Sequence, residues 1–156
     1  MKTLIAYYSK SGANEAAAKD LQKILNADLE KIIDLNSRKG ILGFLSGGSD
    51  ASKKKNAKIA PWRKDPAGYD AVILVSPVWA GFIAPALRTY VGHNKERFKK
   101  IAFLSVSGGG MRNEKALPDL EEFAGKKAVA SLLLSGNEAK EKTREEKMLE
   151  FAKKIK

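Results

Sequence analysis

The sequence predicts an α/β fold in which a parallel β-sheet carries helices on both faces. Five short apolar segments alternate with stretches of helical spacing, and they lie at residues 3–8, 29–34, 71–75, 101–106 and 128–134. Several of these segments are uniformly apolar, which is typical of strands that are buried on both faces of a parallel sheet. The length of 156 residues fits one domain, so residues 1–156 are expected to fold as a single unit.

The first half of the chain begins with a strand at 3–8, which runs into the turn-rich segment 9–14. The next helix has a buried stripe at helical spacing, made of Ala17, Leu21, Ile24 and Leu25. A weaker strand follows at 29–34. Residues 35–69 are poorly patterned, and a short helix is expected within them at 49–55.

The second half repeats the alternation. Strand 71–75 is followed by a turn-like segment, and Pro85 is expected in the first turn of the next helix, where its fixed φ is favourable. A strand at 101–106 and a helix at 114–124 come next, then a strand at 128–134. The last helix is expected at 138–155 with a buried stripe made of Met148, Phe151, Ala152 and Ile155.

Composition excludes several kinds of chemistry. Cys is absent, which excludes thiol catalysis, thiolate metal sites and disulfides, and the single histidine, His93, argues against a metal site built from His. The longest uncharged run, 71–87, contains Pro77 and Pro85, so no membrane span is expected. No secretory signal follows Met1, and a cytoplasmic location is expected.

The chain is strongly basic. Its 29 Lys and Arg against 18 Asp and Glu give a net charge of +11, and residues 53–100 alone hold 11 basic and 3 acidic residues. Such a field favours nucleic acid, anionic lipid, an acidic protein or a phosphorylated ligand, without choosing among them.

Three loops follow the first, third and fourth strands, at the edge where parallel sheets bind ligands. The first is Ser9, Lys10, Ser11, Gly12, Ala13 and Asn14. It joins a strand to a helix N-terminus, whose free N–H groups and dipole favour a phosphate. It matches neither the Walker A pattern nor the dinucleotide fingerprint. The alternative is a plain helix cap formed by Asn14 or Ser11.

The second and third loops offer groups suited to a planar ring. The second contains Ser76, Pro77, Val78, Trp79, Ala80 and Gly81. Its Trp79 either stacks on a ring or covers the end of the sheet, and the Ala80–Gly81 peptide can turn with positive φ. The third contains Ser107, Gly108, Gly109 and Gly110. Either the backbone N–H groups of this loop approach a ligand closely, or the loop is a flexible connector.

Together the three loops resemble the flavodoxin family. Residues 9–14 look like its flavin-phosphate loop, [ST]-x-[ST]-G-x-T, with Asn14 in place of the last Thr and its amide able to donate to a phosphate. The second and third loops resemble its two flavin-ring loops. The resemblance implies a three-layer, flavodoxin-like doubly wound fold of the short-chain type, with five parallel strands in the order 2-1-3-4-5 and FMN between strands one and three.

The resemblance also implies that these three loops are the cofactor-binding residues, with no catalytic side chain and no metal. It implies an FMN-binding protein that carries electrons, and an electron-transfer flavoprotein is favoured over a substrate-specific oxidoreductase. The second residue that stacks on the flavin ring is not decided among Phe44, Trp62 and Phe82. The expected partner is a redox protein with an acidic docking surface, contacted by Lys10, Arg63, Lys64 and Arg112.

Two alternatives remain open. One is an FMN-dependent quinone or small-molecule reductase of the same fold, with a substrate cleft roofed by residues 35–69. The other is a basic binding module that has lost flavin and binds nucleic acid through Lys53, Lys54, Lys55, Lys58, Arg63 and Lys64. Nucleic acid is disfavoured because the basic residues have few aromatic neighbours and form no known motif.

Overall fold

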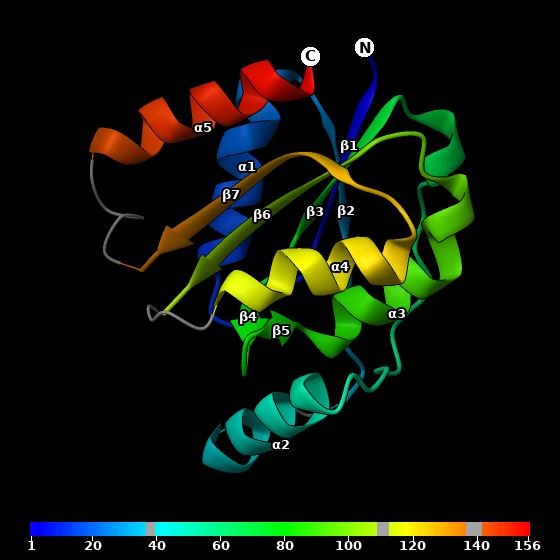
Figure 1. The fold of residues 1–156 in the computed structure, drawn as a ribbon, viewed down its shortest axis with the longest axis vertical. Helices are drawn as coiled ribbons and strands as arrows, with labels where there is room; N and C mark the ends of the chain where they lie inside the picture. Colours follow the sequence, from blue (N-terminus) through cyan, green and yellow to red (C-terminus); the bar gives the residue numbers. More distant parts are fainter. Residues whose placement is uncertain (37–39, 109–112, 137–141) are drawn as a thin grey trace.

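The computed structural model describes residues 1–36, 40–108, 113–136 and 142–156. Its centre is a five-stranded parallel sheet in the order β2-β1-β3-β6-β7 (Figure 1). The strands are β1 (Thr3–Tyr7), β2 (Asp28–Lys31), β3 (Ala71–Val75), β6 (Ile101–Ser107) and β7 (Ala128–Ser135). Counted along the chain, these strands stand in the order 2-1-3-4-5, so the predicted parallel α/β sheet is confirmed.

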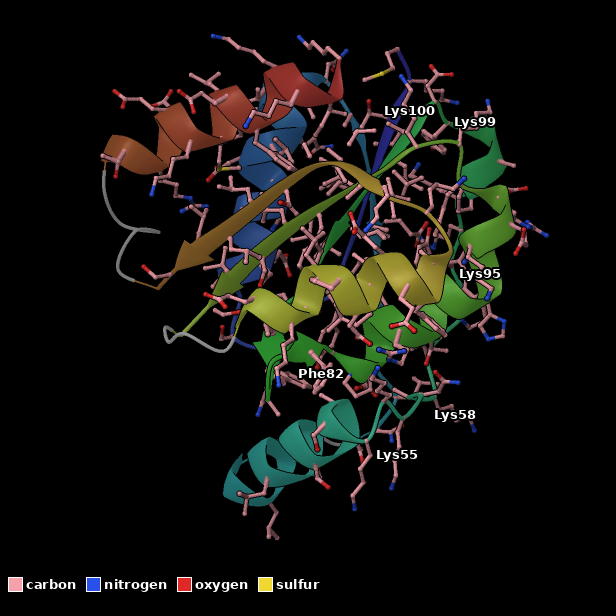
Figure 2. The ribbon with its side chains drawn as sticks, in the orientation of Figure 1. Lys55, Lys58, Phe82, Lys95, Lys99 and Lys100 are labelled. Atoms are coloured by element: carbon pink, nitrogen blue, oxygen red, sulfur yellow. The ribbon has the colours of Figure 1, made fainter. Side chains whose placement is uncertain are left out.

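The parallel register brings the carboxyl ends of neighbouring strands together. Tyr7 at the end of β1 lies opposite Lys31 of β2 and Val75 of β3. The loops after β1, β3 and β6 therefore open at one edge of the sheet. Lys99 and Lys100 immediately precede β6 and lie at the opposite, amino edge, as Figure 2 shows.

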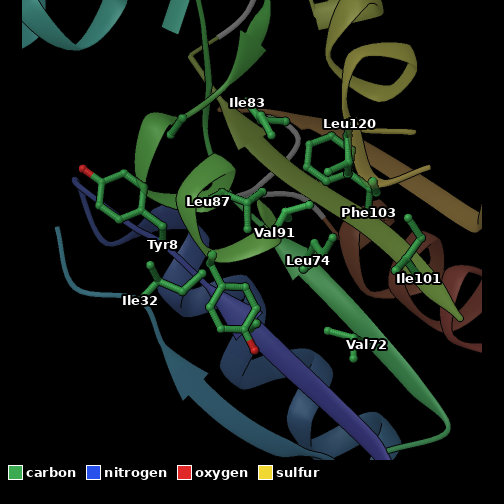
Figure 3. Close-up of a cluster of buried hydrophobic side chains, with 14 of the residues drawn as sticks. Tyr8, Ile32, Val72, Leu74, Ile83, Leu87, Val91, Ile101, Phe103 and Leu120 are labelled. Atoms are coloured by element: carbon green, nitrogen blue, oxygen red, sulfur yellow. The ribbon is translucent and has the colours of Figure 1, made fainter. Parts of the chain in front are cut away.

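Two helices cover each face of the sheet. The helices α3 (Pro85–Asn94) and α4 (Ala116–Ala124) cover one face over a core that includes Leu87, Phe103 and Leu120 (Figure 3). The helices α1 (Ala13–Leu25) and α5 (Lys142–Ile155) cover the other. Successive residues of a strand point to opposite faces, which is why both cores draw on every central strand.

The first and last helices are also tied directly to each other. Arg144 in α5 donates a hydrogen bond of 2.8 Å from its Nη2 to Oδ2 of Asp20 in α1.

Pro85 lies in the first turn of α3, as predicted. Residues 138–141, expected in the last helix, lie outside the described residues. The described residues also include three short 3₁₀ turns, at Pro66–Gly68, Lys95–Arg97 and Asn113–Lys115.

The prediction for residues 35–69 is wrong in one respect. A helix, α2 (Gly40–Ser52), starts well before the short helix expected at 49–55. Its buried positions include Gly43, Gly47 and Ala51, which are spaced four residues apart and carry almost no side chain. A stripe of such small residues gives no apolar period, so the pattern of the sequence does not reveal the helix.

A small antiparallel hairpin leaves the end of β3. It consists of β4 (Val78–Trp79) and β5 (Phe82–Ile83), where the sequence predicts only a turn-like segment.

In the described part of the chain, none of the helices is long and apolar enough to cross a membrane.

An ion pair is buried between the two helices of the α3/α4 face. Arg88 of α3 donates to the carboxylate of Asp119 of α4, and both side chains are 5% exposed. Lys54, just after α2, also reaches Asp119, with its Nζ 3.0 Å from Oδ1. The carboxylate therefore joins three helical segments.

We expect Asp119→Ala to lower the free energy of unfolding by about 3–5 kcal/mol, because it leaves the Arg88 guanidinium buried without a counterion. The control is Arg97→Ala, which breaks the exposed pair of Asp65 and Arg97 and should cost at most about 1 kcal/mol. Urea unfolding measures both. Equal losses from the two substitutions would contradict the structural role of Asp119.

Candidate functional site

A cavity of about 440 Å³ opens at the carboxyl edge of the sheet, beyond β1, β3 and β6. It is lined by residues from all three predicted loops and from the end of β6, namely Lys10, Ser11, Asn14, Pro77, Val78, Trp79, Val106, Ser107 and Gly108. Its volume falls in the range of small-molecule sites. The structure therefore brings the three loops together at one cavity.

The first loop is shaped to leave backbone donors open at the start of α1. Gly12 is the N-cap with φ of +93°, a left-handed conformation that favours glycine, and its N–H donates to Oγ of Ser9 at 3.1 Å. Among the described residues, no side chain caps α1. A Cβ at Gly12 would meet no heavy atom within 4 Å, so the loop faces open space. These features fit an anion cradle better than a plain cap.

Asn14 has a different role from the one its amide was expected to play. The residue is 2% exposed, its Nδ2 donates to the carbonyl of Val106 at 2.8 Å, and its Oδ1 accepts from the N–H of Val106 at 2.9 Å. The side chain thus joins α1 to the end of β6 instead of donating to a phosphate. Its backbone N–H still belongs to the open first turn.

The charge at the start of α1 favours an anion. Glu15 lies in the first turn, and hydrogen bonds from Lys19 at 2.8 Å and Lys31 at 3.1 Å lower the pKa of its carboxyl and offset its charge. Of the described residues that line the cavity, Lys10 is the one with a charged side chain. A phosphate at this helix end would therefore meet a positive field.

The second loop is held by its own serine and by the third loop. Oγ of Ser76 donates to the carbonyl of Pro77 at 2.8 Å and accepts from the N–H of Ala84 at 3.3 Å. Oγ of Ser107 accepts from the N–H of Val78 at 2.9 Å. Both serines therefore act on the loop backbone, and the Ser107 bond fixes the distance between the second and third loops.

The turn between β4 and β5 has the predicted positive φ angles. Ala80 has φ of +50° and Gly81 has φ of +86°. An alanine in this region is strained by about 1 kcal/mol or more, and such strain is common at ligand sites. The turn is therefore a built feature of this edge and not a flexible tip.

Trp79 lines the cavity and packs against Tyr8 and against Gly47 of α2. Its ring makes a T-shaped contact with Tyr8, with 5.6 Å between the centroids. A Cβ at Gly47 of α2 would lie only 3.0 Å from Cζ3 of Trp79, so glycine lets the helix approach the indole closely. Sequence reasoning missed Gly47 and Tyr8, since neither contact is visible in a local pattern.

The other candidates for a second ring wall differ in position. Trp62 packs against Tyr90 and His93, with 5.6 Å between the ring centroids in each case, and does not line the cavity. Phe82 also does not line the cavity, and the ammonium of Lys54 lies 5.5 Å from the centre of its ring. The Phe44 side chain, like Gly109, Gly110 and Arg112, lies outside what the structure describes.

A second cavity of about 590 Å³ lies on the other side of β1, lined by Tyr7, Leu29, Glu30, Lys31, Ile33, Ala60, Pro61, Arg63 and Lys64. Burial and then the nearby Glu15 raise the pKa of the Tyr7 hydroxyl. Oε2 of the buried Glu30 accepts from the N–H groups of Arg63 at 3.1 Å and Lys64 at 2.8 Å. This carboxylate holds residues 63 and 64 against the edge of the sheet, which is a structural role.

Comparisons with known proteins agree with this fold. The family model described as Flavodoxin matches residues 2–150. A flavoprotein from Lactobacillus acidophilus NCFM, solved in complex with FMN, has a TM-score of 0.73 at 22% identity, covering 85% of this chain and 92% of that one. Oxidised flavodoxin 2 from Bacillus cereus has a TM-score of 0.63 at 20% identity, covering 99% and 97%. No curated protein sequence matches the chain.

We expect Asn14→Ala to lower the free energy of unfolding by about 2–4 kcal/mol, because it leaves the buried N–H and carbonyl of Val106 without partners. The control is Asn36→Ala, since Oδ1 of Asn36 accepts one long, exposed bond of 3.3 Å from Lys58. That substitution should cost less than about 1 kcal/mol. Chemical denaturation compares them. A loss no larger for Asn14 than for Asn36 would contradict the role given to Asn14.

Proposed function

Because this chain belongs to the flavodoxin family, we propose that the cavity at the carboxyl edge binds FMN and that the protein carries electrons between redox partners. The predicted cofactor, FMN, is confirmed by this membership, together with the fold shared with a flavoprotein in complex with FMN. The observation that carries the proposed position is the uncapped start of α1, where Ser11 and Asn14 line the cavity formed by three loops.

The phosphate end of the proposed site is residues 9–14. The N–H groups of the first turn of α1 and the hydroxyl of Ser11 donate to phosphate oxygens, and Lys10 supplies positive charge. Ser9 holds the loop in shape through its bond to Gly12. Asn14 contributes its backbone N–H and keeps α1 against β6.

The ring end of the proposed site is residues 76–81 and 107–110. Trp79 forms one wall, braced by α2, and the positive φ angles of Ala80 and Gly81 let their peptide approach the edge of the ring. Ser107 keeps the second loop at a fixed distance from the third. The lining is largely uncharged, so ring contacts are apolar or to backbone groups.

The lining suits an electron carrier. The flavin, when bound, supplies the redox chemistry, and the protein supplies binding, orientation and electrostatics. Transfer of electrons needs no acid or base from the protein, so Lys10 and the uncharged lining suffice. We place the acidic partner at the carboxyl edge, where Lys10, Arg63 and Lys64 line the two cavities.

Two finer points belong to the same proposal. Residues 1–156 act as one domain, which the bond between Arg144 and Asp20 supports by linking the last helix to the first. The protein works in the cytoplasm. The reductase alternative draws its support from α2, which contacts Trp79 of the cavity lining through Gly47 and so lies where a substrate cleft would need a wall.

We expect FMN to bind far more tightly than riboflavin, because the loop donates hydrogen bonds to the phosphate. Ser11→Ala should weaken FMN binding by about 1.5–3 kcal/mol, the range for a bond to a charged group, and leave riboflavin binding unchanged. Calorimetric titration measures both ligands. Ser52→Ala, whose hydroxyl bonds only to Ser49 in the described structure, is the control. Equal affinities for FMN and riboflavin would show that residues 9–14 bind no phosphate.

We expect Gly47→Ala to weaken FMN and riboflavin equally, because the new methyl group pushes the indole of Trp79 into the ring end of the cavity. Gly48→Ala is the matched control, since a Cβ at Gly48 meets nothing within 4 Å. In a Trp62→Phe background, the fluorescence of Trp79 should fall when flavin binds. A Gly47 variant that binds both flavins as the parent does would remove Trp79 from the ring site.

A further inference from the structure

The outer side of α2 carries two exposed leucines and no charged side chain among the described residues, which is unusual for an exposed helix. Leu42 is 82% exposed and Leu45 is 59% exposed, and they are the two most exposed large apolar side chains of the described residues. The exposed residues that complete this side are Ser46, Ser49 and Ser52. Asp50 is the single charged residue of the helix. By contrast, the charged residues of α1 include Glu15 and Lys19.

Leu42 and Leu45 face away from the rest of the protein, because other residues form the side of α2 that packs against it. Gly43, Gly47 and Ala51 are buried, and at 100° per residue they lie on the side of the helix opposite Leu42 and Leu45. Gly47 lies against Trp79, so the helix packs on the hairpin through its small residues. Figure 1 shows α2 standing apart from the sheet at one end of the molecule, with its outer side uncovered.

The end of α2 is fixed in place by Lys54. Its ammonium lies 3.0 Å from the buried carboxylate of Asp119 and 5.5 Å from the centre of the Phe82 ring. Because this anchor joins α2 to α4, the helix is held with its leucines facing outward. The apolar surface is therefore a built feature of the fold.

A group of exposed lysines follows the helix directly. Lys53, Lys55 and Lys58 are exposed, and together they are named the lysine collar. Figure 2 shows Lys55 and Lys58 beside α2, far from Lys99 and Lys100 at the opposite end of the molecule. Lys55 forms a long ion pair with Asp50, its Nζ 3.8 Å from Oδ1, and this offsets one charge of the collar. The collar thus adds positive charge beside the exposed leucines.

We propose that α2 and the lysine collar dock this protein on the surface of a membrane that contains anionic phospholipids. Leu42 and Leu45 enter the boundary between headgroups and acyl chains, and the collar meets the lipid phosphates. An acidic protein surface would pair with the lysines, but it would not account for the exposed Leu42 and Leu45. A second copy of this chain on the same face would bring two lysine collars together and be repelled.

Docking in this way brings the bilayer close to the candidate cavity. The same helix carries Leu42 and Leu45 outside and contacts Trp79 through Gly47 inside. The lipid surface would therefore adjoin the wall of the cavity. The docking surface shares no residue with the cavity lining, so it is tested without flavin and stands or falls apart from the proposed function.

The test is sedimentation with vesicles of phosphatidylcholine alone or with one third phosphatidylglycerol. We expect binding to the anionic vesicles at least tenfold stronger than to the neutral ones. The double variant Leu42→Ser, Leu45→Ser should bind at least tenfold more weakly. Each lysine of the collar changed to Gln should weaken binding about fivefold. The controls Leu149→Ser and Lys99→Gln, both exposed but placed elsewhere, should change binding less than twofold.

A second measurement follows from the absence of Cys in the chain. A Leu45→Cys variant, labelled with an environment-sensitive fluorophore, should brighten and shift to the blue on anionic vesicles, and a labelled Leu149→Cys variant should not. Three results would overturn the proposal. They are no vesicle binding, vesicle binding that the leucine changes leave intact, and self-association in sedimentation equilibrium that the leucine changes abolish.

Discussion

The paired hydrogen bonds between the Asn14 side chain and the backbone of Val106 are the constraint on which the candidate site depends. They join the start of α1 to the end of β6, residues that lie 92 positions apart in the chain. The bond from Val78 to Ser107 then joins the end of β6 to the loop after β3. Through these two connections the three loops have fixed distances from one another, and the cavity has a defined shape before any ligand arrives.

The sequence predicts most of the sheet because the strands are continuous apolar runs and the loops after them are rich in Gly and Ser. It also predicts the turn with positive φ at Ala80 and Gly81, since the glycine adopts that backbone readily. It does not predict α2, whose buried side is made of Gly43, Gly47 and Ala51. Nor does it predict the partner of Asn14, because a contact over such a distance leaves no local pattern.

The positive charge of the chain is divided among separate tasks. Arg88 and Lys54 are bound to the buried Asp119 and hold three helical segments together. Lys19 and Lys31 offset Glu15 beside the anion cradle, and Lys10 lines the cavity. The lysines at the amino edge of the sheet lie far from the candidate site. Net charge alone therefore does not identify a partner, and the position of each cation within the fold decides its role.

The central claim is that all three loops at the carboxyl edge hold one FMN molecule, and hydrogen–deuterium exchange with and without FMN tests it most directly. The account predicts slower exchange in peptides that cover residues 9–14, 76–81 and 105–108, with no change in residues 60–64 beside the second cavity. Protection confined to residues 60–64, or protection of residues 9–14 without 76–81, would contradict it.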